Sequence, residues 1–364
     1  MKISEVIQQL EKLAPLSLQE SYDNAGLIVG DRSAIAKHPI ICLDSTEAVV
    51  DEAIAAGSNL IIAHHPIVFS GLKSITGKNY IEKTILKAIK NDIAIYAIHT
   101  NLDNVKAGVN RMIAKRIGLK DLKILSPKRE ILTKLVFFCP TADAEKVRNA
   151  VFEAGAGKIG EYGSCSFNTK GEGTFRAGEN THPHVGEKGQ LHFEAETRVE
   201  TIVPNNILGK VIQAMIEVHP YEEVAYDLYA LKNAWTEVGS GMIGQLEQPM
   251  EAEKFLDHLK SVLNTEVVRH TKIVNKKVSR IAICGGSGSF LLENAIAQKA
   301  NVFVTADFKY HQFFDANEKL VIADVGHFES EQFTMLLIQE YLQKKIPNFA
   351  TYLSKVNTNP INYR

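Results

Sequence analysis

Short, wholly apolar segments, each followed by a segment of helical periodicity, constrain the fold of this chain more than any other feature. They recur near both ends of the sequence, within residues 39–44, 59–63, 93–98, 279–284, 301–307 and 319–324. Runs this short that are apolar throughout are typical of strands buried on both faces. Their alternation with helices predicts βαβ units and a mostly parallel sheet.

The middle of the chain follows a different pattern. Residues 134–140 read as a strand and 143–154 as a helix, and a glycine-rich polar segment follows up to residue 189. Further on, alternating strands flank another helix, in a β-α-β-β-α-β order that is ferredoxin-like. We therefore predict the α/β class: a mostly parallel-sheet domain in two parts, residues 1–126 and 236–364, interrupted by an inserted ferredoxin-like α+β domain at 127–235.

Composition excludes several classes of protein. The 364 residues are 45% hydrophobic and 23% charged, as in ordinary globular proteins, and the formal net charge of −1 gives no electrostatic basis for binding nucleic acid or an anionic membrane. We find no signal peptide and no apolar run of the roughly 20 residues that span a bilayer. The four cysteines are scattered without a Cys-x-x-Cys pair, which favours the reducing cytoplasm.

Two adjacent histidines, His64 and His65, follow the second apolar run directly, and Pro66 ends the strand. The carboxyl ends of strands in open α/β sheets are where ligands collect. Neighbouring side chains on a strand point to opposite faces, so the two histidines do not easily bind the same ion, although each could bind a separate one. One buried and one solvated histidine is the alternative interpretation.

Two other apolar runs also end in metal-ligand residues. Asp103 follows the run at 93–98, and His327 and Glu331 follow the run at 319–324, four residues apart on one helix face. In a parallel sheet these ends meet at one edge. Five ligands exceed what one tetrahedral zinc needs, so we predict two divalent metal ions per subunit with Glu331 as the bridge. All the predicted ligand atoms are nitrogen or oxygen, so the ligand set does not distinguish among Zn, Fe, Mn, Co and Ni.

Other polar residues near these ends could support the site. We predict a catalytic or ligand-orienting role for His99, which shares a strand end with Asp103. Asp307 and His311 are weaker candidates for orienting ligands, and Asp44 and Asp324 could hydrogen-bond ligand imidazoles or cap strands. The glycine-rich residues 285–288 could hold a phosphate at a helix start, but a plain turn is the better interpretation because the P-loop Lys-Ser/Thr is missing.

Several longer motifs resemble one protein family, the Nif-three-like (NGG-interacting-factor-like) family, whose members are often labelled GTP cyclohydrolase I type 2 homologues. The matching stretches are residues 21–30 (SYDNAGLIVG), 63–66 (AHHP), 99–103 (HTNLD), 284–288 (CGGSG), 305–311 (TADFKYH) and 324–331 (DVGHFESE). The resemblance covers both flanks, departing where Ala306 replaces a common glycine. It implies a dinuclear centre with the ligands His64, His65, Asp103, His327 and Glu331.

The resemblance also implies a homohexamer and, for residues 127–235, an insert similar to PII and CutA proteins. The family label implies a GTP cyclohydrolase-like hydrolase that opens a purine nucleotide ring, with a nucleotide or other small molecule as its ligand. A non-enzymatic, metal-binding regulatory or chaperone-like hexamer is the alternative. We expect neither membrane nor nucleic acid as a partner.

Overall fold

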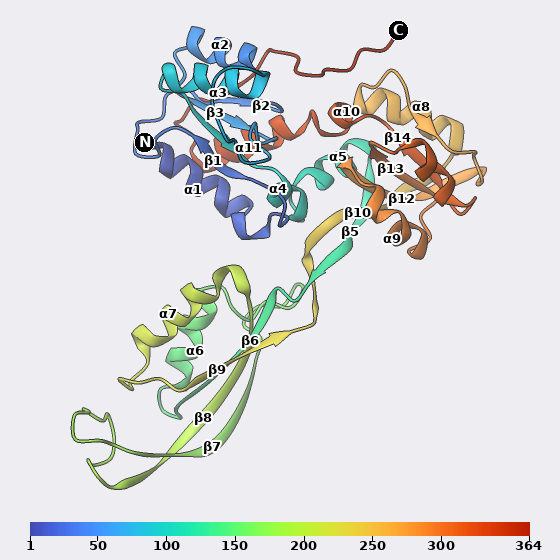
Figure 1. The fold of residues 1–364 in the computed structure, drawn as a ribbon. Coiled ribbons are helices and arrows are strands. Elements are labelled where there is room, and N and C mark those ends of the chain that lie inside the picture. Colours follow the sequence, from blue (N-terminus) through green and yellow to red (C-terminus); the bar gives the residue numbers. More distant parts are fainter. The chain divides into compact units, whose positions relative to one another are not determined.

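The computed structural model describes residues 1–364 and has a mixed α/β architecture with three sheets (Figure 1). The chain divides into two compact units. The larger unit contains Met1–Pro127 together with Glu237–Arg364, and the smaller unit contains Lys128–Thr236. Each helix falls short of the length and hydrophobicity needed to cross a lipid bilayer.

One sheet of the larger unit has five strands in the order β1-β4-β3-β2-β15. The pairs β4–β3, β3–β2 and β2–β15 are parallel, whereas β1 pairs antiparallel with β4. Every residue of β3 and β4 is buried, which explains their unbroken apolar sequence. The strand bounds are β1 (Gly26–Val29), β2 (Ile40–Cys42), β3 (Leu60–Ala63), β4 (Ala94–Ala97) and β15 (Tyr352–Leu353).

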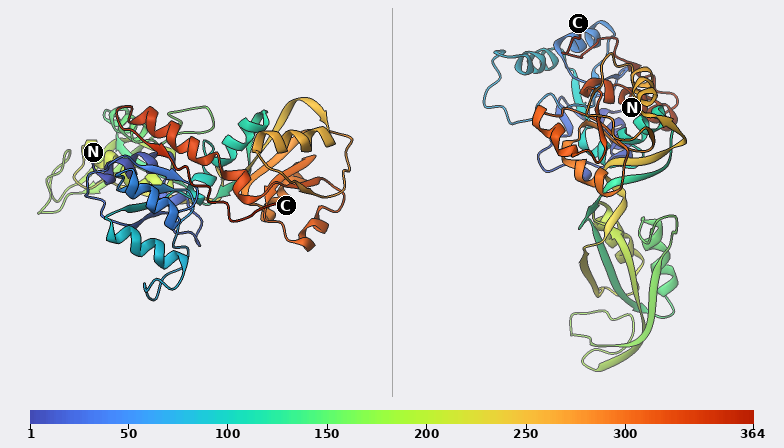
Figure 2. Two further views of the ribbon diagram at one scale, coloured as in Figure 1. Left: turned by 90° about the horizontal axis from the view of Figure 1, so that it is seen from above. Right: turned by 90° about the vertical axis from the view of Figure 1, so that its right-hand side faces the viewer.

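Helices cover this sheet because their apolar faces need the same core. Side chains of α2 and α3 share a buried cluster with Ile61 and Ala63 of β3, and α11 packs on β2 and against α1 (Figure 2). Side-chain caps begin two of these helices, with Thr46 at α2 and Asn79 at α3. The bounds are α1 (Ile3–Leu13), η1 (Leu16–Leu18), α2 (Glu47–Ala55), α3 (Tyr80–Lys90), α4 (Thr100–Asn104) and α11 (Thr334–Lys345).

The second sheet of the larger unit has six strands in the order β11-β14-β13-β12-β10-β5. Its three central strands are parallel, and β11 and β10 pair antiparallel at either side of them. The strands are β5 (Leu119–Arg129), β10 (Ala234–Glu251), β11 (Arg269–His270), β12 (Lys277–Ser287), β13 (Val302–Ala306) and β14 (Val321–Asp324). The helices are α5 (Val109–Ile117), α8 (Ala252–Leu263), η3 (Ser289–Leu291), α9 (Leu292–Ala297), η4 (Tyr310–Ala316) and α10 (His327–Glu331).

The expectation of a single parallel sheet is therefore wrong, because the apolar runs divide between two sheets. An antiparallel strand borders the parallel core of each sheet, and short-range periodicity carries no information on such long-range pairing. One further detail is that the helix that carries His327 and Glu331 ends at Glu331, and a separate helix, α11, follows it.

The smaller unit has the element order β6-α6-β7-β8-α7-β9 and one antiparallel sheet in the order β7-β8-β6-β9. Alternate residues of β6 pack against the helices in a single core. Strand β7 falls in the segment that looked merely glycine-rich and polar, because its side chains are mostly exposed. The bounds are β6 (Leu132–Pro140), α6 (Ala144–Glu153), β7 (Ser166–Arg176), β8 (Leu191–Pro204), η2 (Asn205–Ile207), α7 (Leu208–Val218) and β9 (Tyr226–Leu231).

Candidate metal centre

His64 and His65 lie immediately after the last residue of β3. Their backbone N–H groups still donate to the carbonyl oxygens of Cys42 (3.1 Å) and Leu43 (2.9 Å). The two rings nevertheless face the same side, with centroids 4.8 Å apart. The expectation that they point apart is wrong because β3 ends at Ala63, so the strict alternation of a strand no longer applies.

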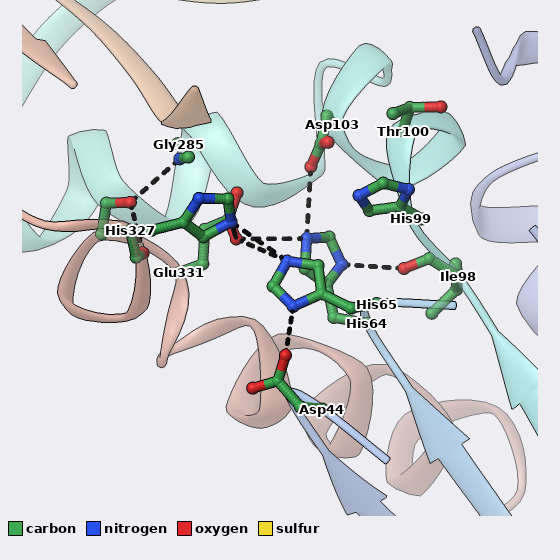
Figure 3. Close-up of polar contacts among 12 residues, drawn as sticks. Asp44, His64, His65, Ile98, His99, Thr100, Asp103, Gly285, His327 and Glu331 are labelled. Carbon is green, nitrogen blue, oxygen red and sulfur yellow. Dashed lines mark hydrogen bonds and ion pairs between the residues drawn. The ribbon is translucent and has the colours of Figure 1, made fainter. Parts of the chain in front are cut away.

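Three imidazoles converge on one carboxylate oxygen, Glu331 Oε2 (Figure 3). The distances to it are 3.0 Å from His65 Nε2, 3.0 Å from His327 Nε2 and 3.7 Å from His64 Nε2. His65 Nε2 and His327 Nε2 are themselves 3.3 Å apart. His327 and Glu331 occupy the first and last positions of α10, so helix geometry supplies their contact. The two sheets therefore bring their histidines to the same point.

The other ring nitrogen of each of these histidines has a fixed partner. The Nδ1–H of His64 donates to the Ile98 carbonyl (2.8 Å), and those of His65 and His327 donate to Asp44 (2.8 Å) and Asp307 (2.6 Å). Metal-binding histidines are held in this way, because a donor role for Nδ1 leaves the lone pair on Nε2. The partners Asp44 and Asp307 agree with the orienting roles considered from the sequence.

Asp103 completes the group from α4. Its Oδ1 atom lies 3.7 Å from Nε2 of the fully buried His64, and neither atom has a hydrogen-bond partner although both are buried. Two facing acceptors without partners are unfavourable in a protein interior. A cation is the kind of group that would satisfy both.

The pKa values of His65, His327, Asp103 and Glu331 are strongly shifted. Burial alone would lower the pKa values of His65 and His327, but Glu331 and the aspartates behind the rings raise them to about 9 and about 11. Burial and the charge of Glu331 raise the pKa of Asp103 to about 8. Burial would also raise the pKa of Glu331, yet the imidazoles hold it well below its usual value. The cluster thus concentrates positive charge, as protons or as a metal, around Glu331.

The glycines of β12 shape the opposite wall of the cluster. The Gly285 N–H donates to Asn110 Oδ1 (3.0 Å) and the Gly286 N–H to Ser330 Oγ (2.9 Å), so neither amide is free for a phosphate. Gly286 has a φ of +60°, and a Cβ atom there would lie 2.5 Å from Glu331 Oε1. The glycine-rich stretch therefore makes room for the cluster.

His99 stands beside the cluster and contacts a residue that sequence reasoning overlooked. Its Nδ1–H donates to Asp23 Oδ1 (2.7 Å), and Asp23 also accepts hydrogen bonds from the backbone and hydroxyl of Thr100. Burial opposes ionisation of Asp23, but the bonds from His99 and Thr100 lower its pKa to about 2. The only signal for Asp23 was its place in the family-like stretch at residues 21–30.

Two of the weaker candidates lie elsewhere. His311 is exposed on η4 and stacks with Phe314. Asp324 contacts Arg269 and accepts hydrogen bonds from the N–H groups of Phe308 and Gly326, so it caps the end of β14 instead of holding an imidazole.

The C-terminal segment supplies further contacts that had no sequence signal. The Thr358 hydroxyl donates to Asp44 Oδ2 (2.7 Å), the other oxygen of the carboxylate that holds His65. The Asn359 side chain donates to Glu329 Oε1 (2.9 Å) on α10. Thr358 and Asn359 thus contact both the carboxylate that holds His65 and the helix α10 that carries His327 and Glu331.

The arrangement fits a metal ion. Ligand atoms of His64, His65 and Glu331 all lie within 4.8 Å of one another. Two ligand atoms on the same tetrahedral ion lie about 3.3 Å apart when metal–ligand bonds are about 2.0–2.1 Å, and the separations of 3.0–3.7 Å in the cluster bracket this value.

Comparisons with known proteins agree with the motifs. The chain is 41% identical over 364 residues to the GTP cyclohydrolase 1 type 2 homolog of Halalkalibacterium halodurans, covering 98% of each chain. It is 35% identical over 369 residues to the protein of the same name from Bacillus subtilis, covering 99% of this chain and 98% of that one. A Bacillus cereus protein related to NIF3 has a solved structure with a TM-score of 0.87 and 40% identity, covering 100% of this chain and 99% of its own. The sequence profile described as Duf34/NIF3 (NGG1p interacting factor 3) matches residues 1–360, and the chain belongs to this family.

Proposed function

We propose that this protein is a metal-dependent hydrolase whose centre holds two divalent ions. The observation that carries the proposal is the convergence of three imidazole Nε2 atoms on Glu331 while each Nδ1 is already hydrogen-bonded. Neutral imidazoles would present only lone pairs to that carboxylate, so a positive charge has to lie among them. Divalent cations supply it at neutral pH without requiring unusual protonation.

The distances suggest how the ligands divide between the two ions. His64 faces Asp103 and Glu331, both at 3.7 Å, which makes one set. His65 and His327 are 3.3 Å apart and each is 3.0 Å from Glu331, which makes the other set. Glu331 belongs to both sets and would be the bridge. The nitrogen and oxygen donors are compatible with Zn, Fe, Mn, Co and Ni.

The residues around the centre support hydrolysis. Bound divalent ions would polarise an electrophile and lower the pKa of water towards neutrality. His99 is placed to move the proton, because its Nδ1–H is committed to Asp23 and its Nε2 remains the basic atom. Asp23 stays ionised and would stabilise the imidazolium that forms. The relatives' name, GTP cyclohydrolase 1 type 2 homolog, suggests opening of a purine nucleotide ring as the first reaction to assay.

The test combines metal content with turnover. Elemental analysis of purified wild type should find about two metal ions per subunit, and Glu331→Ala should remove them. His99→Gln should keep the metal but lower kcat and remove the acidic limb of the pH–rate profile, and Asp23→Asn should shift that limb. His311→Gln is the matched control, because this histidine is exposed and outside the cluster. Full metal content in a variant lacking all five ligands would refute the site.

The alternative is a non-enzymatic, metal-binding regulatory or chaperone-like hexamer. The smaller unit favours this alternative. All residues that line the pocket beside the centre belong to the larger unit. The ferredoxin-like unit therefore has another task, such as PII/CutA-like sensing. Absence of turnover by fully metallated wild type, across GTP and a broad nucleotide panel, would select this alternative.

We also propose that the chain assembles as a homohexamer in the cytoplasm. Exposed aromatic residues such as Tyr310 (73% exposed) and Phe314 (68%) on η4 offer surface that an assembly would cover. The free cysteines fit a reducing compartment. Light scattering of the purified protein measures the assembly directly, and a monomer mass would contradict it.

A further inference from the structure

A pocket of about 520 Å³ opens beside the metal centre, within the range typical of small-molecule sites. Rings and apolar side chains form much of its wall, although several remain open to solvent. Tyr22 is 61% exposed, Phe69 49% and Phe290 64%. The apolar lining includes Tyr22, Phe69, Phe290, Phe328, Pro360 and Ile361. Exposed aromatic surface at the mouth of a polar site is suited to stacking against a flat ring.

The charges of the pocket are unsuited to phosphate. Four carboxylates line it, and no lysine or arginine does. Two more carboxylates lie directly behind it, Asp23 against His99 and Asp307 against His327. Even the charge of two divalent cations would leave these surroundings net negative. Polyphosphate recognition instead relies on guanidinium, ammonium or free backbone N–H groups, and the amides of Gly285 and Gly286 are already used.

The Nε2 atom of His99, in the pocket wall, indicates which polar group a ligand should carry. His99 donates its Nδ1–H to Asp23, so its Nε2 is an acceptor. The His99 ring lies 5.4 Å from the rings of His64 and His65 and 6.2 Å from that of Phe69, measured between centroids. A ligand N–H donated to His99 would therefore be held between Phe69 and the metal centre.

We propose that this pocket binds a flat, phosphate-free ring that carries an amide or amidine N–H, in other words a cyclic amide or cyclic amidine. The ring stacks on Tyr22 and Phe69 and donates its N–H to His99. The inference rests on the proposed hydrolase function and names its substrate class. In the reaction the oxygen of water bonds to the ring carbon, the C–N bond breaks, and the nitrogen leaves with one hydrogen of that water.

Equilibrium binding tests this without relying on turnover. Manganese-loaded wild type is titrated calorimetrically with guanosine, GTP, 5,6-dihydrouracil and tripolyphosphate. Guanosine should bind at least about tenfold more tightly than GTP, dihydrouracil should bind, and tripolyphosphate should not. Loss of a stacking partner in Tyr22→Ala or Phe69→Ala should weaken guanosine binding about tenfold. Tyr80→Ala, a control of nearly equal exposure (64%) outside the pocket, should leave it unchanged.

A charge-adding variant tests the electrostatic argument. Ile361→Lys places a cation on the exposed edge of the pocket, so it should tighten GTP binding several-fold and leave guanosine binding nearly unchanged. Tighter binding of GTP than of guanosine by wild type would overturn the inference, as would failure of both guanosine and dihydrouracil to bind. The hydrolase proposal fails separately, if ligands bind to the metallated protein and none is turned over.

Discussion

Gly286 offers the sharpest test of the metal centre. Its φ of +60° lies in the left-handed region, and an added Cβ would meet Glu331 Oε1 at 2.5 Å and His327 Cε1 at 3.2 Å. A contact below 3.0 Å requires a shift, and Glu331 has little room for one because it is buried with three imidazoles around it. We therefore expect Gly286→Ala to displace this carboxylate from the point where the histidines converge.

The expected loss has two separable parts. The left-handed conformation costs an alanine about 1–2 kcal/mol of folding free energy relative to glycine. Gly57→Ala is the matched control for this part, because Gly57 has a φ of +65° and nothing within 4 Å of the added Cβ. The second part is specific to Gly286. Disturbing groups that orient ligands typically weakens metal binding about 10- to 100-fold, and displacement of Glu331, the proposed bridge, should reach at least that range.

The assay is competition between the protein and a chromogenic chelator for Zn²⁺, together with thermal unfolding of each variant with and without metal. In the metal-free state Gly286→Ala should lose at least as much stability as Gly57→Ala, because it adds the contact with Glu331, and only Gly286→Ala should lose affinity for the metal. If Gly286→Ala binds zinc as tightly as Gly57→Ala does, Glu331 is not at the ion and the reasoning is refuted.

Four further predictions concern the same cluster. Thr358→Val should weaken metal binding several-fold by freeing Asp44, the partner of His65, whereas Thr358→Ser should not. Metal uptake at pH 7 should release protons, because the pKa values of Asp103 and His65 are raised to about 8 and about 9, so affinity measured by chelator competition should increase from pH 6 to pH 9. His65 has a pKa of 6.5 in the unfolded chain and about 9 in the folded protein, so its protonation stabilises the fold. This stabilisation is complete below pH 6.5 and is lost as the pH rises through about 9. The melting temperature of metal-free protein should accordingly fall between pH 7 and pH 10, and a flat profile would contradict this. Chelation at neutral pH should lower the melting temperature of the loaded protein.

The sequence predicted local structure well wherever one feature decides it. Strands β3 and β4 are buried on both faces, so an unbroken apolar run marks them. The ferredoxin-like element order was visible in alternating patterns, apart from β7, whose side chains are largely exposed. Pairing of strands far apart in the chain could not be predicted, because it depends on contacts that no local window contains. The division into two sheets is the result.

The residues of the candidate site were predictable to a similar extent. Histidines and carboxylates at strand ends carry their own chemical signal, and the structure brings all five of them together. Asp23 and Thr358 act through another side chain, so their residue type alone predicts nothing unusual. The convergence of His64 and His65 on one oxygen also escaped prediction, because it depends on β3 ending one residue before the pair.

The origin of the five residues explains why the cluster is so strongly charged. His64, His65 and Asp103 follow strands of the five-stranded sheet, whereas His327 and Glu331 lie on α10, after a strand of the six-stranded sheet. Glu331 contacts histidines from both sides of this junction, and its negative charge needs a positive counterpart in every state of the protein. Without metal, protonated His65 and His327 supply it, which accounts for their raised pKa values. A bound metal ion would replace those protons at the same atoms. Protons and metal ions therefore compete for one set of lone pairs, and the aspartates behind the rings stabilise either occupant.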